Sequence, residues 1–269
     1  MAKDTIQIGE CTVVLNQQKA QGIWEMELKA PLYLSDVSAF MPGQFVCLVP
    51  LDPASVMARP FSISKISVFS GSFTLLYKLV GKNTELMTKL IPGDKVYFWG
   101  PLGQGFLPKS STYDEIWLVG GGIGIAPFVF YNEVMSKLPE SIVRVFYGNR
   151  TQAEIIPLDL YSKEPVVITT DDGSAGYKGP VTDVVANFMK AAMGDKILVI
   201  TCGPNIMMSK VAEICQQAGI ECYVILETIM ACGLNSCKGC TINTESGIKS
   251  VCHDGPVFPA KEVHWNELV

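Results

Sequence analysis

"LVGGGIGIAPF", residues 118–128, runs from the end of an apolar, strand-like segment into a segment with helical character. Pro127 suits the first turn of a helix, where its missing N–H is not needed. Glycines at 120, 121, 122 and 124 would let the backbone approach a pyrophosphate at the free N–H groups of that helix. The stretch lacks the third glycine of G-x-G-x-x-G and is not a P-loop. A turn that is tight only for packing reasons explains the same glycines.

On the C-terminal side of this turn, the rhythm of the sequence predicts an α/β unit. Helical patterns alternate with strand-like segments at 116–119, 141–148, 165–170, 196–201 and 222–226. The best of these patterns places six apolar residues on one helix face: Val181, Val184, Val185, Phe188, Met189 and Ala192. Strands that are apolar nearly throughout indicate a parallel sheet covered on both sides. "CGP", residues 202–204, would follow the fourth strand at the ligand-binding edge, or form a plain strand-to-helix turn.

On the N-terminal side, short strand-like segments are separated by proline and glycine. They lie at 6–15, 22–30, 43–51, 60–68, 72–80 and 94–100, and their number predicts an antiparallel barrel or sandwich. A short helix is expected at 83–90, capped by Asn83 or Thr84, with Lys82 adding positive charge that suits an anion. Taken alone, that cap is also an ordinary helix start. Arg59 in "ARPFSI", residues 58–63, is by itself a solvated barrel residue.

Residues 227–269 fit neither pattern, because they are short, rich in cysteine and glycine, and need an internal staple. "MACGLNSCKGC", residues 230–240, and "SVCHDGPVF", residues 250–258, carry four cysteines. Their spacing, Cys232-x4-Cys237-x2-Cys240-x11-Cys252, is that of the plant-type ferredoxin site for a [2Fe-2S] cluster. Structural zinc is the alternative, although only one CxxC pair is present. The other cysteines are expected to be small buried apolar residues: Cys11, Cys47, Cys202, Cys215 and Cys222.

Length and composition exclude several classes of protein. A chain of 269 residues has room for two ordinary domains and a short appendage, and its formal net charge is −5. The lysines and arginines are scattered, so we expect no nucleic-acid partner. The N-terminus does not resemble a secretory signal, and the longest uncharged apolar run, 116–131, contains four glycines. We therefore expect a cytoplasmic protein without a membrane partner, whose thiols are free or bind metal.

The motifs occur in one order along nearly the whole chain: "RPFS" at 59–62, "VGGGIG" at 119–124, "TDDGSAGYKG" at 170–179, and then the four cysteines. In this order the chain resembles the ferredoxin-reductase-type flavoproteins, and among them the electron-transfer subunits of class 1B dihydroorotate dehydrogenases. The resemblance implies a multi-domain protein with three parts. These are an FAD-binding antiparallel β-barrel at 1–108, an NAD(H)-binding α/β domain with a parallel sheet at 109–226, and a ferredoxin-like [2Fe-2S] segment at 227–269.

The resemblance also assigns site residues, none of them an acid–base catalyst. Arg59 would hold the FAD diphosphate, Pro60, Phe61 and Ser62 would lie along the flavin, and the remaining FAD contacts would be Leu76, Tyr77, Lys78, Asn83 and Thr84. NAD(H) would be bound by Gly120, Gly121, Gly122, Gly124, Asp171, Asp172, Cys202, Gly203 and Pro204. The two aspartates would repel a 2′-phosphate and so favour NAD over NADP. The cluster would be held by Cys232, Cys237, Cys240 and Cys252.

The function that the resemblance implies is electron transfer for another polypeptide. Barrel, α/β unit and tail leave no domain for an organic substrate, so a partner dihydroorotate dehydrogenase subunit containing FMN is expected to oxidise it. Electrons would pass through the cluster and FAD to NAD+ in pyrimidine (UMP) biosynthesis, within a heterotetramer of two catalytic and two electron-transfer chains. Two alternatives stay open: a reductase subunit that links NAD(P)H to ferredoxin or another dehydrogenase, and a non-catalytic binding protein with a zinc-stapled tail.

Overall fold

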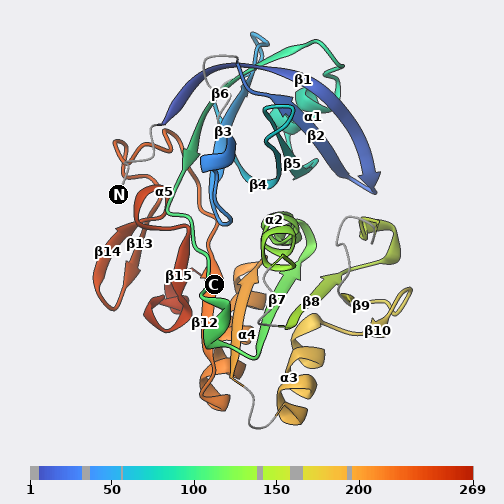
Figure 1. The fold of residues 1–269 in the computed structure, drawn as a ribbon, viewed down its shortest axis with the longest axis vertical. Helices are drawn as coiled ribbons and strands as arrows, with labels where there is room; N and C mark the ends of the chain where they lie inside the picture. The colour runs from blue at the N-terminus through green and yellow to red at the C-terminus, as the bar shows by residue number, and fades with distance from the viewer. Residues whose placement is uncertain are drawn as a thin grey trace.

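The chain forms three parts that lie against one another, with the barrel above, the α/β sheet below and the C-terminal segment beside both (Figure 1). The structure is a computed structural model and describes residues 6–31, 37–55, 57–137, 142–157, 166–192 and 196–268. Ser141 and Pro165, with which two of the expected strands begin, lie outside these ranges. Among the described residues, no helix has the length and hydrophobicity that crossing a bilayer requires.

The N-terminal part is a closed antiparallel barrel with the strand order β1-β2-β5-β4-β3-β6. Its strands are β1 (Gln7–Ala20), β2 (Ile23–Lys29), β3 (Phe45–Pro50), β4 (Arg59–Ser67), β5 (Ser72–Lys78) and β6 (Lys95–Leu102). Side chains of β3 alternate, since Val46 and Leu48 belong to the barrel core whereas Cys47 packs with residues outside it. The prediction of a barrel is confirmed, and the sandwich is not formed.

A short helix, α1 (Lys82–Thr88), follows β5 as expected, but its cap differs from the prediction. The helix begins one residue earlier, with Gly81 as its N-cap, so Asn83 and Thr84 lie inside it. The hydroxyl of Thr84 accepts hydrogen bonds from the backbone N–H groups of Val80 (3.0 Å) and Gly81 (3.1 Å). The threonine thus reaches back to the cap from the first turn, as in a capping box.

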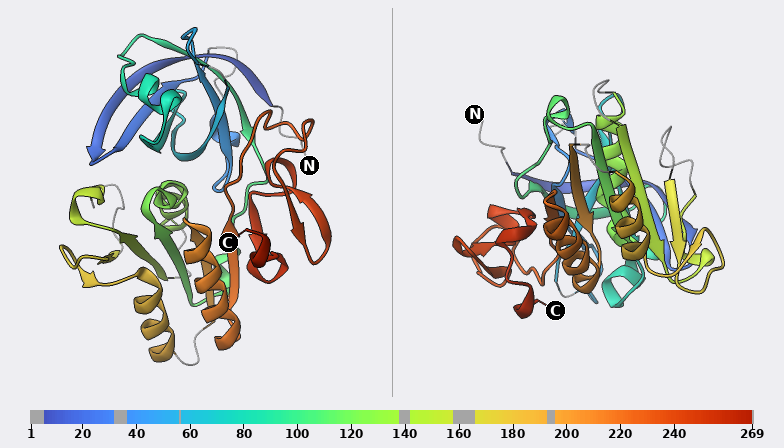
Figure 2. Two further views of the ribbon diagram at one scale, coloured as in Figure 1. Left: turned by 180° about the vertical axis from the view of Figure 1, so that it is seen from behind. Right: turned by 90° about the horizontal axis from the view of Figure 1, so that it is seen from below.

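The central part is a sheet in the order β10-β9-β8-β7-β11-β12-β15, whose five long central strands are parallel. These strands are β7 (Glu115–Gly121), β8 (Ile142–Asn149), β9 (Val166–Thr170), β11 (Ile197–Cys202) and β12 (Glu221–Ile225), and β10 (Tyr177–Lys178) is a short edge strand. Helix α2 (Ala126–Met135) covers the face toward the barrel, while α3 (Val181–Ala191) and α4 (Asn205–Ala218) cover the other (Figures 1 and 2). The predicted parallel sheet is confirmed.

The C-terminal segment is tied into this sheet. Strands β13 (Thr241–Thr244) and β14 (Gly247–Ser250) form a hairpin, helix α5 (Val251–Asp254) follows, and β15 (Val257–Pro259) pairs antiparallel with β12. One continuous hydrophobic core joins Leu102 of the barrel, Val119 of the sheet and Phe258 of this segment. Short 3-10 turns complete the chain: η2 (Val37–Ala39), η3 (Ser110–Thr112), η4 (Gly122–Ile125), η5 (Gln152–Glu154), η7 (Ala260–Glu262) and η8 (Trp265–Glu267).

Candidate functional site

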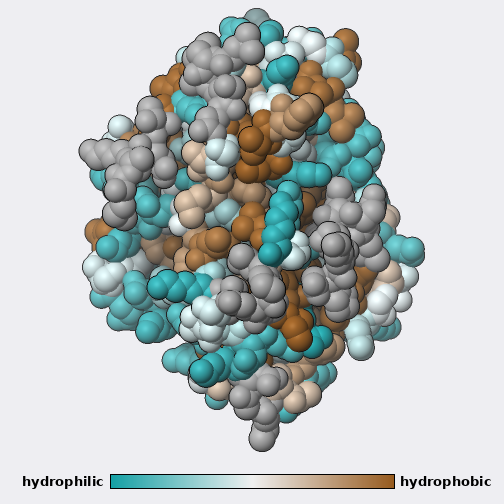
Figure 3. Space-filling model, viewed as in Figure 1, coloured by the Kyte–Doolittle hydropathy of each residue, from teal (hydrophilic) through white to brown (hydrophobic). Residues whose placement is uncertain are grey.

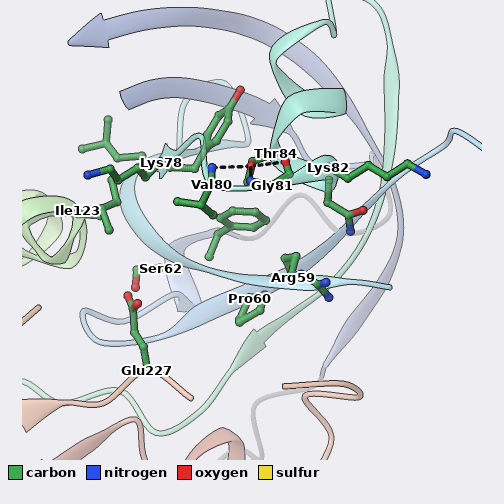
Figure 4. A pocket seen from close by; sticks show the side chains of 15 residues that line it. Arg59, Pro60, Ser62, Lys78, Val80, Gly81, Lys82, Thr84, Ile123 and Glu227 are labelled. Atoms are coloured by element: carbon green, nitrogen blue, oxygen red, sulfur yellow. Dashed lines mark hydrogen bonds between the residues drawn. The ribbon is translucent and has the colours of Figure 1, made fainter. Parts of the chain in front are cut away.

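A cavity of about 420 Å³ lies between strands β4 and β5 of the barrel and the start of α2 (Figure 4). We call it the barrel cavity. All nine residues that the sequence assigns to FAD line it, together with Val80, Gly81, Lys82, Ile123, Ala126 and Glu227. Segments 59–62, 76–78 and 83–84 are therefore brought together by the barrel topology, because β4 pairs with β5 and α1 follows β5. On the face shown in Figure 3, hydrophobic side chains lie near the centre, among hydrophilic ones.

The barrel cavity combines an aromatic wall with cations at its rim. The rings of Phe61 and Tyr77 pack edge to face with centroids 6.0 Å apart, and the Tyr77 hydroxyl donates to Asn16 Oδ1 at 3.0 Å. Burial raises the pKa of Tyr77, so its phenol stays neutral. Arg59 and Lys82 are exposed at the rim (Figure 4). An apolar slot with two cations at its mouth suits a ligand that carries both a flat ring and phosphates.

A second cavity of about 570 Å³, the sheet cavity, lies at the carboxyl ends of the parallel strands. The cavity is lined by residues at or just beyond the end of each strand: Gly121, Gly122 and Gly124 for β7, Asn149 and Arg150 for β8, Asp171 for β9, and Gly203 and Pro204 for β11. Strands β7 and β11 are neighbours in the middle of the sheet, and the chain order reverses between them. Open α/β sheets bind their ligands at such a switch point.

Three residues that the sequence assigns to NAD(H) do not line this cavity. Gly120 belongs to β7, and the thiol of Cys202 is fully buried in β11. Asp172 turns its carboxylate toward Ser174, accepting hydrogen bonds from the hydroxyl (2.6 Å) and the backbone N–H (2.9 Å). These hydrogen bonds hold the pKa of Asp172 below its usual value. Asp171, in contrast, does line the cavity.

Gly124 is a glycine for a packing reason. A Cβ at this position would lie 2.3 Å from the backbone oxygen of Cys202 and 2.6 Å from the Cα of Gly203. The turn after β7 therefore rests backbone to backbone on the turn after β11. The packing explanation for the glycine-rich stretch therefore accounts for Gly124. The same backbone contact holds the two turns together on one side of the sheet cavity.

Glu227, which the sequence analysis did not single out, lines both cavities. Its carboxyl group points toward Ser62 (Figure 4). The Glu227 side chain is accessible from the cavities. Protein atoms nevertheless surround its carboxyl group, and this desolvation raises the pKa of Glu227. Lys78 and Ile123 also line both cavities, so the two share a wall. The only sequence signal for Glu227 is its place just beyond β12, at the carboxyl edge of the sheet.

The four cysteines of the C-terminal segment are gathered by a loop and a hairpin. Cys232 and Cys237 lie in the loop with their Sγ atoms 3.3 Å apart. Cys240 precedes β13 and Cys252 follows β14, so the pairing of Thr241 with Ser250 brings these two together. Both are buried, whereas Cys237 is exposed. Among the described residues, no three His, Cys, Asp or Glu side chains have the geometry to hold a single metal ion.

Backbone N–H groups turn toward the sulfur atoms. Leu234 (3.3 Å) and Cys237 (3.4 Å) donate to Cys232 Sγ, and Asn235 donates to Cys252 Sγ at 3.3 Å. Burial opposes the charge on Cys232, but the N–H donors outweigh it and lower the pKa of this thiol to about 7. Burial and the neighbouring Cys240 raise the pKa of Cys252 to about 12. Four thiols with N–H donors around them suit an iron–sulfur cluster, whose positive irons keep all four ionised.

Comparison with known proteins identifies the class of this protein. A solved structure described as an NADH-dependent reduced ferredoxin-NADP oxidoreductase of flavin-based electron bifurcation superposes with a TM-score of 0.84 and 28% identity. The superposition covers 96% of this chain and 91% of that one. A ferredoxin reductase of carbazole 1,9a-dioxygenase has a similar fold, with a TM-score of 0.66 and 22% identity over 80% of this chain and 67% of its own. The chain is an NAD-linked flavin and iron–sulfur oxidoreductase subunit with the ferredoxin-reductase fold.

The family follows from two models and from close relatives. Residues 227–264 match the iron–sulfur cluster binding domain of dihydroorotate dehydrogenase B, and 118–213 match an oxidoreductase NAD-binding domain. The electron transfer subunit of dihydroorotate dehydrogenase B (NAD+) from Clostridium acetobutylicum is 36% identical, covering 94% of this chain and 95% of its own. That from Streptococcus thermophilus is 33% identical, covering 96% and 99%. The chain belongs to the family of dihydroorotate dehydrogenase B electron transfer subunits. The matched domain supports an iron–sulfur cluster at the four cysteines and not the alternative of structural zinc.

Proposed function

We propose that this chain transfers electrons between a [2Fe-2S] cluster on its C-terminal segment and NAD(H) in the sheet cavity, by way of FAD in the barrel cavity. The observation that carries the proposal is the shared wall: Lys78, Ile123 and Glu227 line both cavities. Two ligands that fill these cavities would meet at this wall, as hydride transfer requires. When bound, FAD exchanges a hydride for single electrons, and the cluster carries one electron at a time.

In the barrel cavity, the side chains bind and orient FAD. Arg59 and Lys82 would hold the diphosphate at the rim, and the rings of Phe61 and Tyr77 would pack beside the flavin. Ser62 lies opposite the carboxyl group of Glu227, which lines both cavities and whose pKa is raised by burial. The remaining predicted contacts complete the lining: Pro60, Leu76, Lys78, Asn83 and Thr84.

In the sheet cavity, the turns after the parallel strands would bind NAD(H). The predicted set, Gly120, Gly121, Gly122, Gly124, Asp171, Asp172, Cys202, Gly203 and Pro204, surrounds the carboxyl ends of β7, β9 and β11. Asp171 lines the cavity and would repel a 2′-phosphate, whereas Asp172 is occupied by Ser174. Selection of NAD over NADP therefore falls to Asp171.

The partner in this proposal is the FMN-containing catalytic subunit of a dihydroorotate dehydrogenase. The full-length similarity to electron transfer subunits supports it. The catalytic subunit would oxidise dihydroorotate in the cytoplasm, and Cys232, Cys237, Cys240 and Cys252 would hold the cluster that receives its electrons. We further propose two copies of each chain in the complex, acting in pyrimidine biosynthesis.

Co-expression with a candidate FMN-containing dehydrogenase tests the proposal. The purified complex should contain flavin and iron and should reduce NAD+ with dihydroorotate. Cys252→Ser should abolish this reaction while NADH still bleaches the flavin absorbance, because only the cluster is removed. Cys215→Ser, which changes a buried cysteine of α4, is the control and should keep the activity. A complex that lacks its cluster and still reduces NAD+ at the wild-type rate would contradict the proposal.

A further inference from the structure

The loop that carries the first three cluster cysteines, residues 230–240, rests on the outer wall of the barrel; we call it the cluster loop. Gly233 has φ +67, and a Cβ there would lie 2.9 Å from both Cys47 Sγ and Leu102 Cδ1. Trp99 Nε1 donates a hydrogen bond of 2.9 Å to the backbone oxygen of Cys232. Side chains of β3 and β6 therefore hold the backbone of a cluster cysteine and of the residue beside it.

The same stretch of β3 borders the barrel cavity. Cys47 pairs directly with Pro60 of β4, and Pro60 lines that cavity. Residues directly opposite each other in an antiparallel pair project to the same face, with Cβ atoms about 4.5–5.5 Å apart. Pro60, Cys47 and Gly233 thus form a short line of contacts from the barrel cavity to the cluster loop. The Cys47 side chain is 1% exposed, so bulk solvent does not reach it.

We propose that Cys47 is a positioning residue for the iron–sulfur cluster. Its thiol fills the space between Pro60 and Gly233, and together with the Trp99 hydrogen bond it sets how far the cluster lies from the FAD site and how dry that side of the cluster is. The inference rests on the proposed function, since it takes the four cysteines as cluster ligands and the barrel cavity as the FAD site.

The size of the side chain gives the physical reason. An alanine at this position would leave a void beside Gly233, and the cluster loop would lose contacts on the side that faces the barrel. The groups around the ligands and the access of solvent set the reduction potential of an iron–sulfur cluster, and changes to such outer partners weaken metal binding. A shift of the loop should therefore change the potential without changing the ligands.

The test compares Cys47→Ala, Cys47→Ser and Trp99→Phe in the holoprotein, with Cys11→Ala as the control. Cys11 is also fully buried, but it lies in the core of the barrel on β1. Anaerobic titration followed by electron paramagnetic resonance gives the midpoint potential of the cluster, and a chelator measures iron loss. Cys47→Ala and Trp99→Phe should shift the potential and lose iron roughly tenfold faster. Cys47→Ser, which keeps a small polar group there, should lie between them and the wild type.

A wild-type potential and rate of iron loss in Cys47→Ala would overturn the inference, as would an equal shift in Cys11→Ala. The inference would also be overturned if the Cys232→Ser variant still assembled a cluster and the double variant Cys232→Ser, Cys47→Ala did not. Cys47 would then be a ligand of the cluster. If Cys47→Ala does not fold, Trp99→Phe decides, because it leaves β3 intact, keeps an aromatic ring against the core and removes the hydrogen bond to Cys232. Flavin and iron contents of the wild type are measured first: their absence would refute the proposed function, whereas their presence with unshifted potentials refutes only this inference.

Discussion

Among the residues that the structure describes, Glu227 is the one carboxyl group that lines both cavities, and its titration should be visible in the stability of the protein. Burial raises its pKa, so the folded state favours the protonated form. The stability that this form contributes is complete below the usual glutamate pKa and is lost as pH rises through the raised value. Glu227→Gln keeps a neutral side chain, so the cofactor-free variant should become more stable than the wild type at high pH only.

Urea unfolding from about pH 4 to about pH 8 measures this difference. Glu10→Gln, which removes one charge from an exposed position of β1, controls for the change in net charge. If the difference in the free energy of unfolding between wild type and Glu227→Gln stayed constant over the whole pH range, the Glu227 carboxyl would not titrate as its burial implies.

The pKa of Glu115 is shifted in the opposite direction to that of Glu227, because the Glu115 carboxylate accepts hydrogen bonds from three side-chain N–H groups. Arg144 donates from Nε (2.7 Å) and Nη2 (2.8 Å), and Trp117 Nε1 donates at 2.6 Å. The Arg144 hydrogen bonds, with that of Trp117, hold the pKa of this buried carboxylate below its usual value. The stability it contributes is present above the usual glutamate pKa and is lost as pH falls through the lowered one.

Arg144→Met should therefore destabilise the protein by about 2 kcal/mol at neutral pH, since it leaves the carboxylate without its main partner. The loss should shrink as the solution is acidified, because protonation removes the charge that needs the arginine. Chemical denaturation at neutral and acidic pH measures both values. Lys89→Met, which breaks an exposed i,i+4 ion pair with Glu85, is the matched control and should cost about 0.5 kcal/mol or less.

At the scale of elements, the two turns that border the sheet cavity should act as one unit. A methyl group at Gly124 would meet the Cys202 carbonyl, which is backbone and cannot rotate away. Gly124→Ala should therefore push the turns after β7 and β11 apart, destabilise the protein by about 1–3 kcal/mol and weaken NADH binding. Gly81→Ala is the control for stability only, because Gly81 has an extended backbone and no atom within 4 Å of the added methyl group, but it lines the barrel cavity.

Urea unfolding and NADH titration by fluorescence are the two measurements. A Gly124→Ala protein with unchanged stability and weaker NADH binding would mean that the glycine serves the ligand alone. Unchanged values for both would mean that the two turns move independently, contrary to their backbone contact.

Elements with strong periodicity could be predicted from the sequence, and those held by tertiary contacts could not. The six barrel strands and the five apolar parallel strands show their pattern along the chain itself, and the cysteine spacing is local as well. Strand β15 is only three residues long, and its pairing with β12 is set by tertiary structure.

Glu227 and Cys47 belong to no motif, because each acquires its place only when segments distant in sequence meet. The side chains of Asp171 and Asp172 are equivalent in sequence, and only the turn geometry separates them.

At the scale of the whole molecule, the three parts should unfold together. Their common core contains Phe45 of the barrel, Val199 of the sheet and Phe258 of the C-terminal segment. Phe258 is 4% exposed and packs against Gly255, where an added Cβ would lie 2.2 Å from its ring. Replacing it removes apolar contacts at the point where the segment joins the sheet, through the pairing of β15 with β12.

Phe258→Ala should therefore lower the stability of the entire protein by about 3–5 kcal/mol, and not merely release the C-terminal segment. Unfolding of the holoprotein in urea, followed by circular dichroism, flavin release and loss of cluster absorbance, should show one shared midpoint that moves in the variant. Phe69→Ala provides the matched control, since Phe69 is fully exposed and its loss should change stability by about 0.5 kcal/mol or less. If the cluster absorbance were lost at a lower urea concentration than flavin release, with the flavin midpoint unmoved by Phe258→Ala, the segment would be an independent unit. A shared midpoint that moves in the variant instead means that barrel, sheet and C-terminal segment unfold as one cooperative unit through their common core.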